Sequence, residues 1–552
     1  MRRRTFLKLA TVAGTANITL PTLSQAKPVK AKDRPAPIPV KDFELNEITL
    51  DALQKGLEKG KYSAVDLVKK YLSRIEDIDQ QGPNLNAVVE LNPDALAIAA
   101  ALDKERKAKG PRGPLHGIPI LLKDNIDTHD RLTTTAGSLA LEGSIAPQDS
   151  FVAQRLRQAG AVILGKTNLS EWANFRGSKS TSGWSGRGGQ TRNPYALDRN
   201  PSGSSSGSAV AVSASLCPVA IGTETDGSIV SPSSYNGIVG IKPTVGLVSR
   251  AGIIPISHTQ DTAGPMARTV RDAAILLGAL AGVDPRDSRT GVPERLASPD
   301  YTQFLEPNGL RGARLGVPRK LFGSNKVQEK LINQLLEAMK KEGAVIVDPA
   351  DLPSDGKFGG NEYQIMLYEF KAGLNAYLAT LGPSAPVKSL KEIIEFNEKH
   401  GDQELRWFGQ ESMLAAEAKG PLTDKAYLDA VATCRRLSQE GGIDAIMDQH
   451  KLDALVAPTT GPAHVTDYIY GDRGSGGSTW PAAVAGYPSI TVPATQIHGL
   501  PVGLSFFGRA WSEPKLLRIA YSFEQMTKGR KPPGYWPNLQ SFDPERPYDG
   551  RG

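Results

Sequence analysis

Short apolar segments alternate with helical segments along much of this chain, and this alternation constrains the fold most strongly. The segments 117–122 (GIPILL), 161–165 (AVILG), 217–222 (CPVAIG) and 237–241 (GIVGI) each have the length and composition of a buried strand. Strands that alternate with helices form a sheet that the helices cover, because both elements must bury an apolar face. We therefore predict an α/β fold with a central sheet between layers of helices.

Helix signals agree with this fold. Ser63 is placed as an N-cap, with apolar residues at helical spacing from Leu67 to Ile75. A second helix is expected from about Asp94 to Gly110, and the charged region 325–450 is expected to be mostly helical. Three more strands are predicted to return to the same sheet at 452–458, 489–494 and 501–508. The pattern indicates one large domain.

The amino-terminal residues have the layout of a targeting segment. Residues 1–26 run from a basic start through a modestly apolar middle to small residues. Arg3 and Arg4 fit a twin-arginine signal, the address for export of folded proteins, although Arg2 stands where Ser or Thr is usual. A basic tail without a targeting role is the alternative. We expect export to the periplasm and, after cleavage, a proline-rich tether over 27–45.

Charge and hydropathy exclude two classes of partner. The net charge of +7 lies entirely in residues 1–34, and the chain from Pro35 onward is formally neutral. Without a basic face we expect no nucleic-acid partner. No apolar run is long enough to predict a membrane span, whereas 39% apolar residues suffice for a large core. The sequence predicts no oligomeric state.

The stretch 200–216 (NPSGSSSGSAVAVSASL) holds seven serines and no charge. Its second half is small and apolar, so it reads as a glycine-rich loop that enters a buried helix rather than as a flexible linker. Gly203–Gly207 also fits the G-x-S-x-G nucleophile elbow, with Ser205 as nucleophile. That motif needs a preceding strand, and ALDRNP contains none, so the elbow is the weaker interpretation.

Other motifs carry little weight. Gly160–Thr167 fits the phosphate-loop pattern, but a helix precedes it and its middle residues form a strand, the reverse of the required context. The seven histidines are scattered without metal-ligand spacing, although the sequence does not exclude a Ser-His-Asp triad. We expect no cofactor and no metal. Cys217 and Cys434 leave a disulfide open, but Cys217 is better explained as a buried thiol.

Three segments have properties that suit one another. An apolar strand delivers Lys123 into a buried position, where its pKa falls and the neutral amine can act as a base; a lysine that only reaches past the strand end is the alternative. The serine loop is the second segment. In the third, a strand ends in a small-residue turn that carries Ser228, and the exposed amides of such a turn suit an oxyanion hole.

These segments resemble the amidase signature family, serine hydrolases of carboxamides that use a Ser-Ser-Lys triad. The likeness is continuous from 199–212 through 222–257 and returns at 455–463 and 499–525. It implies a domain over 46–540, more variable and mostly helical at 290–440, with a mixed central sheet covered by helices on both faces. PSGSSSGS together with TETDGSIVSP is most similar to bacterial peptide amidases, which release ammonia from C-terminal peptide amides.

The resemblance also implies roles for single residues. Ser228 matches the nucleophile, Ser204 the bridging serine after a cis peptide bond, and Lys123 the base. The other serines of the loop are then expected to hold it and cap its helix. The implied oxyanion hole consists of the backbone amides of Thr225, Asp226, Gly227 and Ser228.

Asp226 departs from the family pattern, since many members have glycine there. Its carboxylate either contacts substrate N–H groups or caps the turn, and the sequence leaves both open. The expected substrate is a small-molecule or peptide amide. One alternative is an aryl or fatty-acid amide hydrolase. Another is the glutaminase subunit of an amidotransferase, against which the export signal argues. The third is a non-catalytic binding protein, against which the three matched residues argue.

Overall fold

The computed structural model describes residues 36–539 except 293–297, 355, 359, 384 and 475. The targeting segment at 1–26 and residues 27–35 of the predicted tether lie outside the described residues. None of the described helices is both long and apolar enough to cross a bilayer.

The core is an eleven-stranded sheet in the order β1-β3-β2-β6-β8-β7-β12-β13-β11-β9-β10. β2 runs parallel to β3 and β6, and β9 runs parallel to β10 and β11, whereas the other neighbouring strands of this sheet pair antiparallel. The predicted mixed α/β sheet is therefore confirmed. Its strands are β1 (Val88–Leu91), β2 (Pro119–Lys123), β3 (Val162–Thr167), β6 (Val219–Glu224), β7 (Val239–Lys242), β8 (Thr262–Ala267), β9 (Arg314–Gly316), β10 (Val345–Val347), β11 (Ala454–Pro458), β12 (Ser489–Ile497) and β13 (Leu500–Phe507).

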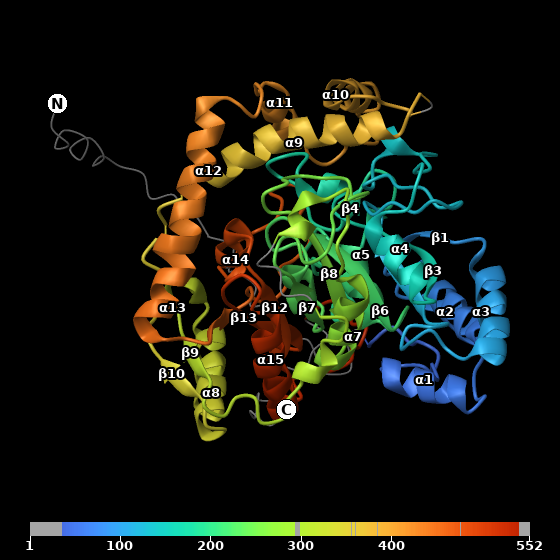
Figure 1. The fold of residues 1–552 in the computed structure, drawn as a ribbon. Coiled ribbons are helices and arrows are strands. Elements are labelled where there is room, and N and C mark those ends of the chain that lie inside the picture. Colours follow the sequence, from blue (N-terminus) through green and yellow to red (C-terminus); the bar gives the residue numbers. More distant parts are fainter. Residues whose placement is uncertain are drawn as a thin grey trace, which may run out of the picture. The chain divides into compact units, whose positions relative to one another are not determined.

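Helices cover both faces of this sheet (Figure 1). α7 and α15 pack on each other and on the central strands, and α5 packs with α6 against strands of the same sheet. α9, α10 and α11 lie together at the top of the view, and α12, which packs on α9, runs down its left side (Figure 1). The helices that contact the sheet are α2 (Ala64–Ile75), α3 (Ala95–Lys109), α4 (Phe151–Gln158), α5 (Ser206–Ser213), α6 (Val230–Tyr235), α7 (Val270–Leu280), α8 (Lys326–Lys341) and α15 (Glu513–Thr527).

The remaining helices build the edges and the upper layer. The predicted helical region 325–450 is confirmed, since β10 is its one strand among the described residues. These helices are α1 (Leu50–Glu58), α9 (Asn361–Thr380), α10 (Leu390–Lys399), α11 (Glu411–Glu417), α12 (Lys425–Ser438), α13 (Asp444–His450) and α14 (Thr479–Ala485).

The predicted start of α2 and the predicted end of α3 agree with the local structure. Ser63 Oγ accepts a hydrogen bond from the Asp66 amide at 3.0 Å, and the Asp66 carboxylate accepts one from the Ser63 amide at 2.9 Å, which makes a capping box for α2. Gly110 ends α3 with φ of 81°, a conformation that glycine adopts without strain. Local capping therefore fixes the start of α2 and the end of α3.

Two uncertain motifs are resolved by the fold. In the phosphate-loop look-alike, α4 precedes β3, and the Lys166 ammonium donates to Ile126 O, Thr133 O and Thr134 Oγ1 at 2.8–2.9 Å. The Lys166 side chain therefore binds groups of the protein, which leaves it unsuited to bind a phosphate. Cys217 and Cys434 are both buried and free, so they form no disulfide with each other.

The central strand β8 is absent from the strands that the sequence predicts. Its sequence, TAGPMA, has no continuous apolar run, and it carries a glycine and a proline. A Cβ atom at Gly264 would lie 2.0 Å from Ile241 O, so the close approach of β7 requires glycine. β8 lies between β6, which leads into the turn that carries Ser228, and β7.

Candidate active site

Lys123 is the last residue of β2 and is completely buried. Its Nζ lies 2.7 Å from Ser204 Oγ, 2.8 Å from Thr223 Oγ1 and 3.3 Å from Thr223 O. β2 pairs with β6, which ends at Glu224, so the sheet register brings Lys123 beside Thr223. The lysine therefore does not reach past the strand end into solvent. It points into a polar site between β6 and the serine loop.

The environment of Lys123 favours its neutral form. Burial lowers the pKa of the amine from 10.5 to about 7, and the negative charges of Asp261 and Glu224 oppose only part of this shift. A neutral amine has a free lone pair, which can accept the hydroxyl proton of Ser204 across the 2.7 Å contact. The pair can thus take up a proton near neutral pH.

The backbone around Ser204 is tightly held. The Gly203–Ser204 peptide bond is cis, as the resemblance implied, and the Ser170 amide donates to Ser204 O at 3.1 Å. A Cβ atom at Gly203 would lie 2.2 Å from Ser170 Oγ, so no larger residue fits there without movement. These contacts fix Ser204 Oγ, which is completely buried, against Lys123.

The other serines tie the loop to its surroundings. Ser205 Oγ donates to Thr223 O at 3.0 Å and accepts from the Thr223 amide at 3.1 Å. Ser206 Oγ bonds Ser202 O, and Ser208 Oγ bonds Ile221 O. The prediction that these serines hold the loop is confirmed. The prediction that they cap α5 is wrong, because Ser205 stands at the N-cap without a side-chain capping bond.

The turn that carries Ser228 is organised by Glu224. The buried Glu224 carboxylate accepts from the amides of Gly227 at 3.0 Å, Ile229 at 2.7 Å and Val230 at 3.0 Å. Lys242, also buried, lies close enough to lower the pKa of Glu224, although burial raises it more. Gly227 has φ of 75°, which glycine tolerates. One carboxylate therefore binds three backbone amides of the turn.

This arrangement narrows the predicted oxyanion hole. The Gly227 amide is already bonded to Glu224, so it is not free to bind an oxyanion in this structure. Among the described residues, no acceptor is found for the amides of Thr225, Asp226 and Ser228. The last two flank the amide that is bonded to Glu224, and they remain available to an incoming carbonyl oxygen.

The structure brings Lys123 and Ser204 into direct contact and places the Ser228 turn against the serine loop. The Ser205 amide donates to Ser228 O at 3.2 Å, which joins the two segments. Ser228 is 8% exposed, so solvent and small ligands reach it more readily than the buried pair. Within the described chain, Ser228 Oγ makes no hydrogen bond, which leaves its hydroxyl free to meet a substrate.

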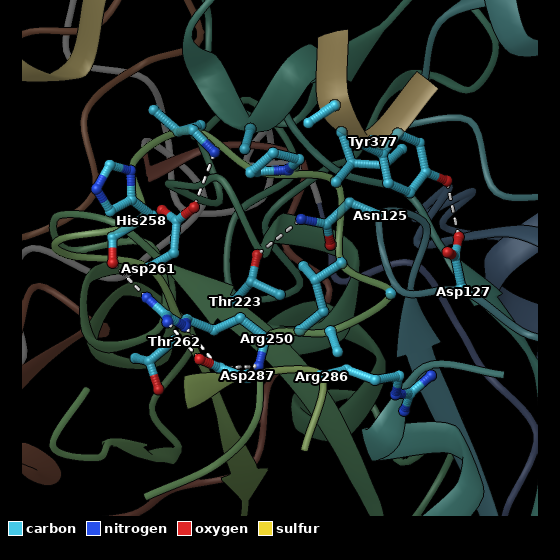
Figure 2. A pocket seen from close by; sticks show the side chains of 18 of the residues that line it. Asn125, Asp127, Thr223, Arg250, His258, Asp261, Thr262, Arg286, Asp287 and Tyr377 are labelled. Carbon is cyan, nitrogen blue, oxygen red and sulfur yellow. Dashed lines mark hydrogen bonds and ion pairs between the residues drawn. The ribbon is translucent and has the colours of Figure 1, made fainter. Parts of the chain in front are cut away.

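Two cavities flank these segments. A groove of about 440 Å³ runs beside the turn and includes Ser202, Ser231, Thr479 and Trp480. A second cavity of about 480 Å³ lies behind Thr223, on the side of Asn125. Figure 2 looks into the second cavity and shows the hydrogen bond from Asn125 to Thr223, which is 3.0 Å long. Neither Lys123 nor Ser204 lines either cavity.

Sequence reasoning missed three residues of this site. Thr223 accepts from both Lys123 and Asn125 through one hydroxyl, and Glu224 caps the turn. Only their positions in the sequence could have indicated these residues. Thr223 and Glu224 end the strand that leads into Ser228, and Asn125 follows Lys123 by two residues. Residue type alone does not separate a threonine at a strand end from one that holds a lysine.

The chemistry open to this site follows from its side chains and turn amides. In the described part of the chain, no group of three or more His, Cys, Asp or Glu side chains is arranged to hold an ion. The Lys123 amine and the serine hydroxyls suit acid–base and nucleophilic steps, and the amides of the turn suit the stabilisation of a developing negative charge. A buried neutral lysine bonded to one serine, beside a second serine on an amide-rich turn, defines an acyl-transfer site.

Comparisons with known proteins agree with this class of site. The family model Amidase matches residues 66–517, so the chain belongs to the amidase family. A solved relative is the native peptide amidase from Stenotrophomonas maltophilia, which is 54% identical with a TM-score of 0.86 and spans 90% of this chain and 100% of that one.

Two curated relatives cover similar lengths. One is a protein of Arabidopsis thaliana named "Probable amidase", 44% identical over 89% of this chain and 92% of its own. The other is a glutamyl-tRNA(Gln) amidotransferase subunit of a Synechococcus strain, 36% identical over 90% of this chain and 96% of its own. The protein is an amidohydrolase with the amidase signature fold.

Proposed function

We propose that this amidase hydrolyses C-terminal peptide amides through a Ser228-Ser204-Lys123 triad and releases ammonia. The observation that carries the proposal is the 2.7 Å contact between Ser204 Oγ and a buried lysine whose pKa is lowered to about 7. A lysine in that state is a base at neutral pH, and its one serine partner lies in the loop that also touches the Ser228 turn.

In the proposed chemistry a proton moves from Ser228 through Ser204 to Lys123 during attack, and it returns along the same residues when the leaving group departs. Lys123 takes the proton of Ser204, Ser204 takes that of Ser228, and Ser228 Oγ attacks the amide carbon. The amides of Asp226 and Ser228 stabilise the oxygen that becomes negative. The proton returns along the same path to the departing nitrogen as the C–N bond breaks. Water then cleaves the acyl-enzyme by the same route and leaves a free acid.

Two features support a peptide amide as the substrate. The relative at 54% identity is itself a peptide amidase, and the 440 Å³ groove beside the turn offers room for an acyl chain. On the opposite side, Thr223 and Asn125 are bonded to each other and Thr223 to Lys123, so they form a wall between the lysine and the 480 Å³ cavity. We propose that this wall limits the leaving group to NH2, because overpacking disfavours a bulkier group.

The test is mass spectrometry of a peptide amide of about ten residues after complete digestion. We expect a single product, heavier only by the exchange of the terminal NH2 for OH, with every internal bond intact. A ladder of shorter fragments would show that the leaving-group side admits a peptide chain and would overturn the proposed specificity.

A substrate panel separates the alternatives. Ammonia release from peptide amides should exceed that from aryl amides, fatty-acid amides and free glutamine at equal concentration. Faster release from glutamine would favour a glutaminase, the alternative that agrees with the amidotransferase relative. Faster release from long-chain amides would favour a fatty-acid amide hydrolase.

Export remains a proposal that rests on Arg3 and Arg4. Replacing both by lysine should keep the precursor in the cytoplasm as a folded, active enzyme, because the twin-arginine route reads the pair itself. Cell fractionation with activity measurements checks this, and a conventional cytoplasmic protein serves as the leakage control. Undiminished periplasmic activity of the double variant would contradict the assignment.

A further inference from the structure

The carboxyl group of Asp226 has no structural task in the turn that carries it. The turn amides of Gly227, Ile229 and Val230 are all capped by Glu224. No backbone amide of the described residues donates to Asp226. The sequence left two roles open for the Asp226 carboxylate, capping of the turn and contact with substrate N–H groups. Glu224 does the capping, so the contact with substrate is the role that remains.

Asp226 Oδ1 is also shielded from solvent without a hydrogen-bond partner in the described chain. A buried acceptor that stays unpaired is costly, and such atoms in native proteins often mark a place for a ligand. A further neighbour of this side chain is Thr479, which lowers the pKa of Asp226 and lines the groove beside the turn. Thr479 also lies over Gly227, where an added Cβ would come within 3.2 Å of it. The unpaired oxygen thus lies two residues from Ser228 and next to a residue that lines the groove, although Asp226 is not itself one of the lining residues.

The surroundings of Asp226 favour the protonated form of its carboxyl group. Burial raises its pKa well above the usual range, and the nearby charge of Glu362, at the start of α9, raises it further. Glu362 itself accepts from Gln260 Nε2 at 3.0 Å, and the same Nε2 donates to Thr225 O at 3.3 Å. A protonated Asp226 places no negative charge beside a developing oxyanion, and its carbonyl oxygen can still accept an N–H.

We propose that Asp226 is a specificity residue whose Oδ1 accepts the N–H on the carbon next to the scissile carbonyl. Its substrates would then be α-amido amides, meaning peptide amides and N-acylated amino-acid amides, in preference to amides that lack this N–H. The geometry requires only that the substrate carbonyl binds at the amides of the same turn, since the N–H then lies one carbon away. This inference rests on the proposed function of that turn.

The test uses two substrates that differ in one group: N-acetyl-leucinamide and its ester analogue, in which oxygen replaces the N–H. Both have the same size and the same terminal amide, and ammonia release gives kcat/KM for each. The enzymes are the full-length wild type, Asp226→Ala and Asp226→Asn. Asparagine keeps a neutral acceptor at this position, whereas alanine removes it.

We expect the wild type to prefer the N–H substrate by about tenfold to a hundredfold, the range for a site that loses a buried hydrogen-bond partner. Asp226→Ala should lose this preference, because kcat/KM for the N–H substrate should fall about tenfold to a hundredfold further than kcat/KM for the ester analogue. Asp226→Asn should retain most of it. An equal loss of rate on both substrates in Asp226→Ala would show a structural role and overturn the inference, as would a preserved preference.

Failure of the proposed function would look different. If the wild type released ammonia from neither substrate, the assignment as a peptide amidase would fail before Asp226 was tested. If the wild type hydrolysed both at the same rate, the peptide amidase would stand and the role of Asp226 would fall.

Discussion

Ser228→Ala is expected to lose at least about 10⁴-fold in kcat on a peptide amide, since removing a nucleophile leaves only binding and oxyanion stabilisation. Covalent labelling by a serine-reactive phosphonate should disappear with it. The substitution removes a single hydroxyl that makes no hydrogen bond within the described protein, so the fold should be unaffected. Ammonia release and mass spectrometry of the labelled protein measure both losses.

Ser205→Ala is the matched control. Among the described residues, Ser205 Oγ is bonded only to the backbone of Thr223. Its loss should therefore lower the free energy of unfolding by about 1–3 kcal/mol, because the Thr223 amide is left unpaired, but it should leave labelling intact. Most of the activity should remain. If folded Ser205→Ala lost labelling and Ser228→Ala kept it, the G-x-S-x-G elbow would be the correct interpretation and the proposed triad would be wrong.

Much of the sheet could be predicted from the sequence because its strands are local and apolar. β2, β3, β6 and β7 coincide with the short buried runs, and Lys123 stands out as a charge at the end of one of them. A lysine buried on a strand is expected to have a lowered pKa, so its role as a base could be predicted from the sequence. The serine loop was equally visible, since small residues permit close packing against β6.

The contacts between distant segments could not be predicted in the same way. Nothing in TAGPMA indicates that β8 passes between β6 and β7, because that position depends on the close approach at Gly264. Likewise, Glu224 looks like one more acidic residue until its carboxylate is seen to bond three turn amides. That bonding withdraws the Gly227 amide from the predicted oxyanion hole and leaves the Asp226 carboxyl free for another role.

The second large effect is expected at Lys123. If its neutral amine is the base, kcat/KM should rise with pH along the acidic limb with an apparent pKa of about 7, the value to which burial lowers this lysine. Lys123→Met keeps most of the volume but has no amine to take up a proton. We expect a loss of about 10²- to 10⁴-fold in rate, together with a flat profile through this range.

Lys166→Met is the matched control for Lys123→Met. Lys166 is also buried, and burial also lowers its pKa, but it bonds Thr134 and two backbone carbonyls instead of a serine of the site. When folded, this variant should keep the acidic limb of the wild type. An acidic limb that persists unchanged in Lys123→Met would show that another group takes the proton from Ser204.

Thermal unfolding gives a second measurement of the same pKa, independent of activity. Unfolding returns the lysine to its ordinary pKa of 10.5, so between about pH 7 and 10.5 the unfolded chain binds a proton that the folded protein does not. The wild type therefore gains stability from this group as pH rises through that window, and Lys123→Met does not. The melting temperature of Lys123→Met minus that of the wild type should be more positive at about pH 6 than at about pH 10. A difference that does not change with pH would mean that Lys123 is charged in the folded enzyme, and a charged amine cannot accept the proton of Ser204.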